Sequence, residues 1–319
     1  MSNLSALSSR AIIGNFYRTL ESTALPGWVP GTALTVPSNQ ESETYKWLGM
    51  SPAMREWVGG RSAKGFRVDG ITITNKTYEA TLKVSLDDMR RDKTGQIMAR
   101  VGELAERAAL HPTSLLSELI IAGETTACYD GQLFFDTDHS EGSSGTQDND
   151  LVFDISDSTP SGYGGTSTAP TPLTIQRSIL QAVSAIMGFK DDQGQPMNET
   201  ANEFAVMVPP SFMAPTMIAT SSSTLGNIED NPLANGRAGF RIVPYVNPRL
   251  TWTTKLAVFR TDGRVKPFIF QEEQGTQIDA IAEGSELEFN NREHHYGVTR
   301  ICNVGYGYWQ HACLVTLQA

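Results

Sequence analysis

A change of hydrophobic period between residues 71 and 122 constrains the fold more than any other feature of this sequence. From Ile71 to Val84, apolar and polar residues alternate, which is typical of a half-buried β-strand. The phase of this alternation shifts across residues 75–77, so we predict a bulge or bend there. A helical pattern follows, in which one stripe carries Ile97, Val101, Leu104 and Ala108.

The helical span is long for a compact globule. Its 38 residues, 85–122, would reach up to roughly 55 Å as one helix. Pro112 predicts either a kink or the end of one helix and the start of another. A rod of this length is natural for an extended subunit.

The rest of the chain keeps helices and strands in separate blocks. Residues 123–170 are rich in turn residues, and Thr171 followed by Pro172 predicts the start of a helix. A buried strand is expected at 204–208, stopped by two prolines, with a helical turn at 211–220. Further strands are expected at 241–246, 251–260, 265–270, 287–289 and 298–317. This order indicates an α+β fold.

Charge and cysteine content restrict the function classes. The chain of 319 residues has 35 acidic and 25 basic side chains, a net charge of −10, so it should repel polyanions on average. Three cysteines cannot all pair with one another, which favours a reducing compartment. The first residues lack the apolar core of a signal peptide, and the most apolar stretch, 115–122, is too short to span a bilayer.

Residues 1–45 read as an arm because proline and glycine interrupt their short apolar pieces. Phe16, Tyr17 and Trp28 are large apolar groups on a segment that cannot build a core alone. Two readings remain open: the arm packs on its own domain, or it lies on another subunit. Glycines at 59, 60 and 65 favour a turn or hairpin tip after it.

Candidates for catalysis or metal binding are few. Asp136, Asp138 and His139 could hold a divalent metal, but the EF-hand spacing is incomplete and a polar turn explains them better. His294 and His295 would point to opposite faces of a strand and so would not chelate one ion. The sequence contains no nucleophile elbow, HExxH motif or phosphate-binding loop. We therefore expect no catalytic residue, metal or cofactor.

A short basic run precedes the first predicted strand and comprises Arg55, Arg61, Lys64 and Arg67. Glu56 and Asp69 interrupt it, and the chain as a whole is acidic. A solvated face or a contact with an acidic surface of a neighbouring subunit explains this run better than nucleic-acid binding.

Several long strings resemble the Mu-like phage major head subunit family, often called gpT. The resemblance covers nearly the whole chain and is densest over 16–150. It rests on FYRTLE (16–21), WVP (28–30), SETYKWLGMSPAMREWVGGR (42–61), ITITNKTYEATLKVSLDDMRRD (71–92), AERAALHPTSLLSELI (105–120) and YDGQLFFDTDH (129–139).

The resemblance implies the Hong Kong 97-like major capsid fold. In that fold an N-terminal arm precedes an extended hairpin, a peripheral domain with a long spine helix, and an axial domain. The expected boundaries are 1–45 for the arm, 46–77 for the hairpin, 78–122 and 263–300 for the peripheral domain, 123–170 for a loop-rich insertion, and 171–262 and 301–319 for the axial domain.

The same resemblance implies the function and partners. The chain would be a virion protein, assembled in the bacterial cytoplasm into hexamers and pentamers of an icosahedral shell. Scaffolding protein, portal and a decoration protein would be partners. Packaged double-stranded DNA would be enclosed without sequence-specific binding, and no membrane would be involved. Without a long helical leader, any scaffold should be a separate protein.

Inter-subunit contacts are expected from Phe16, Tyr17, Trp28, Trp47, Met54, Trp57, Arg61 and Lys64. Interfaces favour aromatic and methionine side chains, whereas lysine is depleted there. Arg61 and Lys64 are included because their basic run could meet an acidic surface of a neighbouring subunit. Relatives with this fold can cross-link a hairpin lysine to an asparagine. No partner can be assigned to Lys64, and we predict no cross-link. Two alternatives remain: a nanocompartment shell of the same fold, and a metal-dependent enzyme using Asp136, Asp138 and His139.

Overall fold

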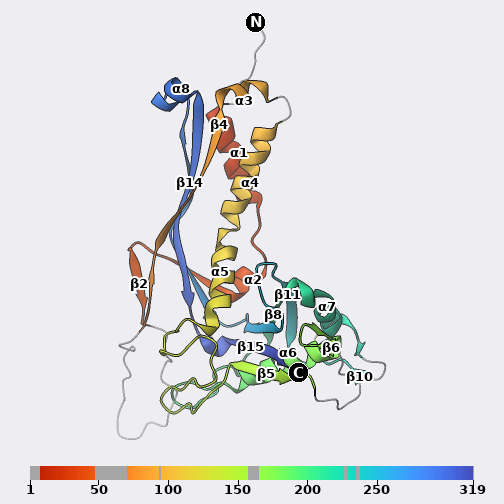
Figure 1. The fold of residues 1–319 in the computed structure, drawn as a ribbon. Helices are drawn as coiled ribbons and strands as arrows, with labels where there is room; N and C mark the ends of the chain where they lie inside the picture. Colours follow the sequence, from red (N-terminus) through yellow and green to blue (C-terminus); the bar gives the residue numbers. More distant parts are fainter. Residues whose placement is uncertain are drawn as a thin grey trace, which may run out of the picture.

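The chain divides into an elongated half and a rounded half in the computed structural model (Figure 1). The structure describes residues 8–46, 70–92, 95–156, 165–225, 229–234 and 238–318. The described chain begins near the far end of the elongated half and ends in the rounded half (Figure 1). Within the described residues, no helix is both long and apolar enough to cross a lipid bilayer.

A four-stranded sheet runs along the elongated half in the order β1-β13-β14-β4. Its strands are β1 (Ala33–Pro37), β13 (Phe268–Ile281), β14 (Glu293–Tyr306) and β4 (Lys76–Ser85). β1 is parallel to β13, and the other neighbours are antiparallel. The register of β13 on β14 shifts twice between Glu272 and Gln277. Two strands of 14 residues each give this half its length.

Helices cover one side of this sheet. α4 (Gln96–Ala109) and α5 (His111–Ile121) follow one another closely, with Leu110 between them and Pro112 in the first turn of α5. Pro112 therefore separates two helices, one of the two outcomes expected for it. α1 (Ser9–Ser22) packs against α4, and α3 (Leu86–Arg91) caps the far end (Figure 1). Asp92 accepts hydrogen bonds from the backbone amides of Gln96 and Ile97 at the start of α4.

The rounded half contains a five-stranded sheet in the order β11-β8-β12-β15-β5. Its strands are β11 (Arg241–Val246), β8 (Glu203–Val208), β12 (Lys255–Arg260), β15 (Ala312–Gln318) and β5 (Asp150–Asp154). α6 (Pro172–Gly188) contacts β15 and β12, and α7 (Met213–Ser221) packs on α6. Thr171 caps α6 by accepting a hydrogen bond from the amide of Thr174, which confirms the predicted start of this helix.

Shorter elements complete the chain. They are α2 (Trp28–Thr32), α8 (Glu286–Asn291), the pair β2 (Ser42–Tyr45) and β3 (Ile71–Thr74), the pair β6 (Gly165–Thr166) and β7 (Ala169–Pro170), the pair β9 (Thr224–Leu225) and β10 (Glu229–Asp230), and the 3-10 turns η1 (Ala122–Glu124), η2 (Pro210–Phe212) and η4 (Trp309–His311). Asn75 separates β3 from β4, at the predicted change of phase.

Two hydrophobic clusters form the core of the chain. The smaller cluster lies in the elongated half and includes Ile12 and Phe16 of α1, Val101 of α4 and Tyr296 of β14. The larger one surrounds the five-stranded sheet and extends to α5, β1 and the near ends of β13 and β14. The α+β class is confirmed. The helical span expected at 85–122 is present as α3, α4 and α5 and not as one helix.

The structure corrects four sequence predictions. The strand expected at 251–260 begins at Lys255. Residues 287–289 belong to helix α8 and not to a strand. The strand expected at 265–270 begins at Phe268 and continues to Ile281. The run 298–317 is two strands, β14 and β15, separated by the turn η4.

Candidate subunit interface

The described part of the arm is folded onto its own chain. Phe16 has no exposed surface and packs in the smaller cluster, while Trp28 is 3% exposed and joins the larger one. Tyr17 is 36% exposed, and its hydroxyl accepts a hydrogen bond from the amide of Ile278. Of these three side chains, Tyr17 alone offers substantial surface to a neighbour, and its part in an interface stays a prediction.

The expected hairpin is anchored where its two strands meet. β2 and β3 pair antiparallel, with Tyr45 opposite Ile71, so the paired stem begins at Ser42, before the expected start at 46. The hydroxyl of Tyr45 donates to Gln271 Oε1 at 2.7 Å, and burial raises the pKa of this phenol to about 12. A Cβ on Gly70 would lie 2.7 Å from the carbonyl oxygen of Tyr45, so the close approach requires glycine.

Five predicted interface residues lie beyond this stem. Trp47, Met54, Trp57, Arg61 and Lys64 fall within 47–69, outside the described residues. Their contacts with a neighbouring subunit stay predictions.

A buried polar cluster occupies the loop-rich region between α5 and β5. His139 Nδ1 lies 2.7 Å from Asp130 Oδ2, and the Cys128 thiol donates to Asp130 Oδ1 at 2.9 Å. The His139 ring stacks on Trp309 at 3.9 Å between ring centroids. Burial raises the pKa of Cys128 strongly. Burial also acts to raise the pKa of Asp130, but hydrogen bonds from His139 and Cys128 outweigh it and lower this pKa.

This cluster fits hydrogen bonding better than metal binding. Zinc holds its ligand atoms about 2.0–2.3 Å from the ion, which separates them by more than 3 Å. Distances of 2.7 and 2.9 Å are those of direct hydrogen bonds. Asp136 accepts from the amides of Leu133 and Thr137, and Asp138 accepts from Gln132. The predicted carboxylate–imidazole set is thus divided among separate turn contacts.

The two adjacent histidines of β14 face opposite sides, as predicted. His294 is 1% exposed beside Tyr296 and Glu288, while the side chain of His295 is 33% exposed near Glu293. They do not form one chelating pair.

Sequence reasoning missed the role of His311, which lies in η4 between β14 and β15 and contacts the loop between β12 and β13. Its Nδ1 lies 3.0 Å from the carbonyl oxygen of Val265, and the ring is 4% exposed. Burial lowers its pKa to about 4, and the nearby Arg260 guanidinium acts in the same direction. No motif marks this residue, because its burial depends on a segment about 50 positions earlier.

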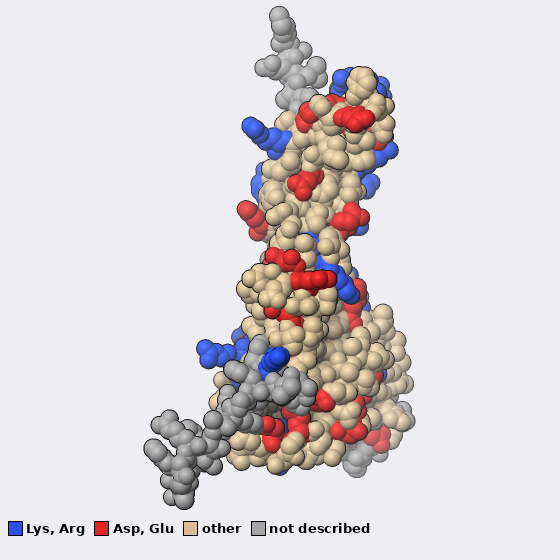
Figure 2. All heavy atoms as spheres, turned by 90° about the vertical axis from the view of Figure 1, so that its left-hand side faces the viewer, with Lys and Arg blue, Asp and Glu red and all other residues tan. Residues whose placement is uncertain are grey.

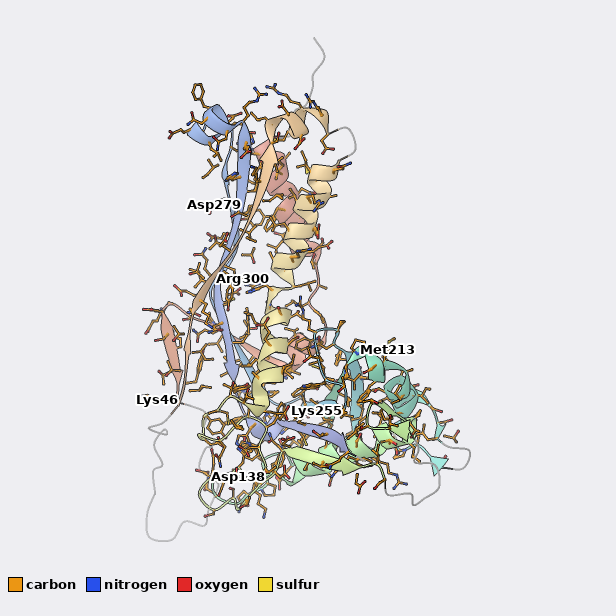
Figure 3. All side chains as sticks on the ribbon, in the orientation of Figure 1. Lys46, Asp138, Met213, Lys255, Asp279 and Arg300 are labelled. Carbon is orange, nitrogen blue, oxygen red and sulfur yellow. The ribbon has the colours of Figure 1, made fainter. Side chains whose placement is uncertain are left out.

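Exposed apolar side chains gather at two further places. Met213, Met217 and Ile218 lie on the outer face of α7 and are 51%, 38% and 47% exposed, and Figure 3 shows Met213 at the outer side of this helix. Phe289 of α8 is 87% exposed at the far end of the elongated half. Ser285, followed three positions later by Glu288, is a capping signature that could have revealed α8.

Charges of both signs are interspersed along the elongated half on the face shown in Figure 2. Ion pairs across this half include Lys83–Glu293 and Arg292–Asp87.

An elongated sheet with a lengthwise helical rod, joined to a rounded α+β half, is a fold that this chain shares with subunits of phage capsids and of a virus-like particle. The structure is similar to a chain of the bacteriophage JBD30 procapsid, with 25% identity and a TM-score of 0.56, covering 100% of this chain and 77% of that one. It is also similar to a capsid chain of cyanophage P-SCSP1u (12% identity, TM-score 0.56, covering 93% and 89%). A virus-like particle from Pyrococcus furiosus shares the fold at 8% identity (TM-score 0.53, covering 96% and 98%).

The sequence places the chain within one family of this class. Residues 10–163 and 251–318 match the family described as Mu-like prophage major head subunit gpT, and the chain belongs to this family. It is 41% identical over 107 residues to the major capsid protein of Escherichia phage Mu, covering 34% of this chain and 35% of that protein. It is 37% identical over 110 residues to the Mu-like prophage FluMu major head subunit of Haemophilus influenzae, covering 34% and 36%. These matches span about a third of each relative.

Proposed function

We propose that this chain is the major capsid protein of a Mu-like tailed phage or prophage. Its copies would assemble into hexamers and pentamers of an icosahedral shell that encloses double-stranded DNA. The observation that carries the proposal is the likeness of the whole chain to a procapsid subunit, in a chain that belongs to a head-subunit family. In this role the chain is a structural protein and not an enzyme.

The form of the subunit supports such a role. An elongated chain has more surface for its volume than a sphere, and a specific contact needs roughly 1,200–2,000 Å² in total. Exposed apolar side chains lie at opposite parts of the molecule, on α7 and on α8, and could be buried in two different contacts. A net charge of −10 would repel packaged DNA and leave it free to move.

The finer partners belong to the same proposal. A scaffolding protein, a portal and a decoration protein would join the shell, and assembly would take place in the bacterial cytoplasm. The stem formed by β2 and β3 would carry residues 46–70 to a neighbouring subunit. The nanocompartment alternative is supported by likeness of fold alone. For the metal-dependent enzyme, Asp136, Asp138 and His139 do not gather as one ligand set, and the cluster of Cys128, Asp130 and His139 is joined by direct hydrogen bonds.

Electron microscopy and analytical ultracentrifugation of the expressed chain test the proposal. With a scaffold from the same phage type, we expect closed particles of uniform diameter that sediment far faster than the 34.8 kDa monomer. A chain that stays monomeric with and without scaffold, across salt and protein concentration, would refute it.

A further inference from the structure

β4 is an edge strand along its whole length. It runs along the elongated half beside β14 (Figure 1), and no described strand pairs with its other side. No proline interrupts its ten residues. A long edge strand presents a row of unpaired backbone groups, which is a template for a strand of another chain.

The backbone groups on this free edge belong to the odd-numbered residues. The amide of Leu86 donates to the carbonyl oxygen of Arg292, in line with the register of β4 on β14. Successive residues of a strand point their amide and carbonyl groups to opposite sides, so the even-numbered residues face β14. Glu79, Thr81 and Lys83 therefore turn their amides and carbonyls away from the sheet.

The side chains of β4 form two rows. The polar row consists of Thr77, Glu79, Thr81, Lys83 and Ser85, and the apolar row on the side of α4 consists of Tyr78, Ala80, Leu82 and Val84. The helices cover the apolar row incompletely, since Ala80 is exposed and Tyr78 and Leu82 are half-buried. Two hollows of about 310 Å³ each separate this row from α4, one at residues 78–80 and the other at 82–84.

A second copy of β4, running antiparallel, matches this strand in one register. The two free edges can share hydrogen bonds only where odd-numbered residues lie opposite each other. With Thr81 opposite Thr81 of the second copy, each Glu79 lies opposite a Lys83. Registers centred on Glu79 or on Lys83 would place like charges opposite each other, which destabilises a strand pair.

The same register also matches the apolar rows. Tyr78 lies opposite Val84 of the second copy, and Ala80 lies opposite Leu82. Pairs of an aromatic and a β-branched side chain stabilise neighbouring strands, as do pairs of threonines such as that at the centre. The half-exposed apolar row would thus be covered by its own counterpart.

Lys83 already contacts Glu293 at 2.7 Å, and this pair leaves room for a second carboxylate. The Lys83 side chain is 62% exposed, and its ammonium has three N–H donors. Glu79 is exposed and accepts a hydrogen bond from the Thr81 hydroxyl at 3.0 Å. The charge pairs select the register, whereas backbone hydrogen bonds and the apolar rows supply the attraction. The contact therefore does not depend on the net charge of the edge.

We infer that β4 of one copy pairs with β4 of a second copy across a two-fold axis centred on Thr81. Two four-stranded sheets would become one continuous sheet. The contact is isologous, because both copies use the same surface. The inference rests on the proposed function, which supplies neighbouring copies, and it adds a two-fold contact to the ring contacts that hexamers and pentamers require.

Disulfide formation by a single-cysteine variant tests the two-fold axis. Thr81→Cys would lie opposite its own counterpart at about 5.5 Å between Cα atoms, a separation that a disulfide can bridge. Assembled shells are oxidised with copper phenanthroline, and the chain's own cysteines, Cys128, Cys302 and Cys313, are buried. We expect at least about tenfold more linked dimer than from Asp279→Cys.

Asp279 is the matched control because it lies level with Thr81 on the same sheet. It is exposed on β13 (Figure 3), where it pairs with Gly297, and Gly297 in turn pairs with Thr81. A cysteine there has the same access to oxidant and lies two strands from the proposed contact.

A second cross-link tests the register. Copies carrying Glu79→Cys should form a disulfide with copies carrying Lys83→Cys. Glu79→Cys alone should not, because the two cysteines would be offset by about 13 Å along the strands. Linked dimer from Glu79→Cys alone would refute the register.

Thr81→Pro separates assembly from folding. An edge strand tolerates proline where the lost amide faces solvent, so the melting temperature of the free subunit should change little. The same change removes hydrogen bonds at the centre of the contact and should raise the concentration needed for assembly at least about tenfold. Glu79→Lys, which places like charges opposite each other, should also weaken assembly. Unchanged assembly by both variants would overturn the inference.

The outcomes separate this inference from the proposed function. Closed shells in which Thr81→Cys gives no more linked dimer than Asp279→Cys would overturn the inference and leave the proposed function standing. A linked dimer from a chain that forms no shell would support the two-fold contact and overturn the proposed function.

Discussion

Truncation of Phe16 to alanine distinguishes an arm folded on its own chain from an arm that depends on a neighbour. The ring of Phe16 has no exposed surface and lies in the smaller cluster with Ile12, Val101 and Tyr296. Removing a buried phenyl ring loses its transfer free energy and leaves a cavity, which together cost about 3–5 kcal/mol. A domain is stable by roughly 5–15 kcal/mol, so the loss should be large.

The assay is chemical unfolding of unassembled subunits, followed by circular dichroism. We expect Phe16→Ala to lower the free energy of unfolding by about 3 kcal/mol or more and to leave the denaturant slope unchanged. Tyr17→Ala is the matched control on the same helix. Because Tyr17 is 36% exposed, its truncation should cost about 1 kcal/mol.

A different pattern would refute this reasoning. If Phe16→Ala left the free energy of unfolding within about 1 kcal/mol of the unchanged chain, α1 would not be part of the subunit core. Loss of shell formation under those conditions would support the alternative in which the arm is stabilised by another subunit.

Three other changes have expected outcomes. Acid should destabilise the fold between pH 6.5 and about 4, because His311 binds a proton in this range when unfolded but not when folded, where its pKa is about 4. Unfolding measured against pH should show a loss of about 3 kcal/mol in the free energy of unfolding, and His311→Gln should reduce this loss. Asp150→Asn should raise the melting temperature at pH 8 but not at pH 4. Burial and Glu124 raise the pKa of this carboxyl to about 6, so its charged form destabilises the fold above that pH. Because the side chain is partly exposed, the expected gain in the free energy of unfolding is about 1 kcal/mol. Gly307→Ala should cost about 1–3 kcal/mol in urea unfolding, because its Cβ would lie 2.3 Å from the carbonyl oxygen of Lys266, whereas Gly188→Ala meets no atom within 4 Å and should change stability little.

The sequence predicted helix and strand boundaries well where residues at the boundary itself begin or end the element. Thr171 and Pro172 define the beginning of α6, and the prolines at 209 and 210 end β8. The alternation from Ile71 and the break at Asn75 are both present in β3 and β4. These features depend on neighbours in sequence, which a pattern can show.

Other features depend on partners that are distant in sequence. Phe16 is a core residue because α1 meets α4, some 80 positions later, and no property of residues 1–45 indicates that meeting. Leu287 and Phe289 alternate with glutamates and so suggested a strand, but the hydrogen bond from the amide of Glu288 to Ser285 starts a helix. The alternation therefore hid the helix at this exposed tip, although the capping residues Ser285 and Glu288 mark its start.

The polar stretch 271–277 shows why the length of the sheet was underestimated. Gln271, Glu272 and Gln274 interrupt the apolar run that ends at Phe270, yet β13 continues through them to Ile281. Beyond Gln271, buried or half-buried residues alternate with exposed ones, because one face of the sheet is covered by α1 and α4 while the other meets solvent. The two register shifts lie in this stretch, between the residues that β13 contributes to the larger cluster and those it contributes to the smaller one. Arg300 binds Glu272 here and reaches the carbonyl oxygen of Ala108 at the end of α4. One strand can therefore contribute residues to both hydrophobic clusters. Between them it is held by an ion pair and by irregular strand pairing, and not by a continuous apolar run.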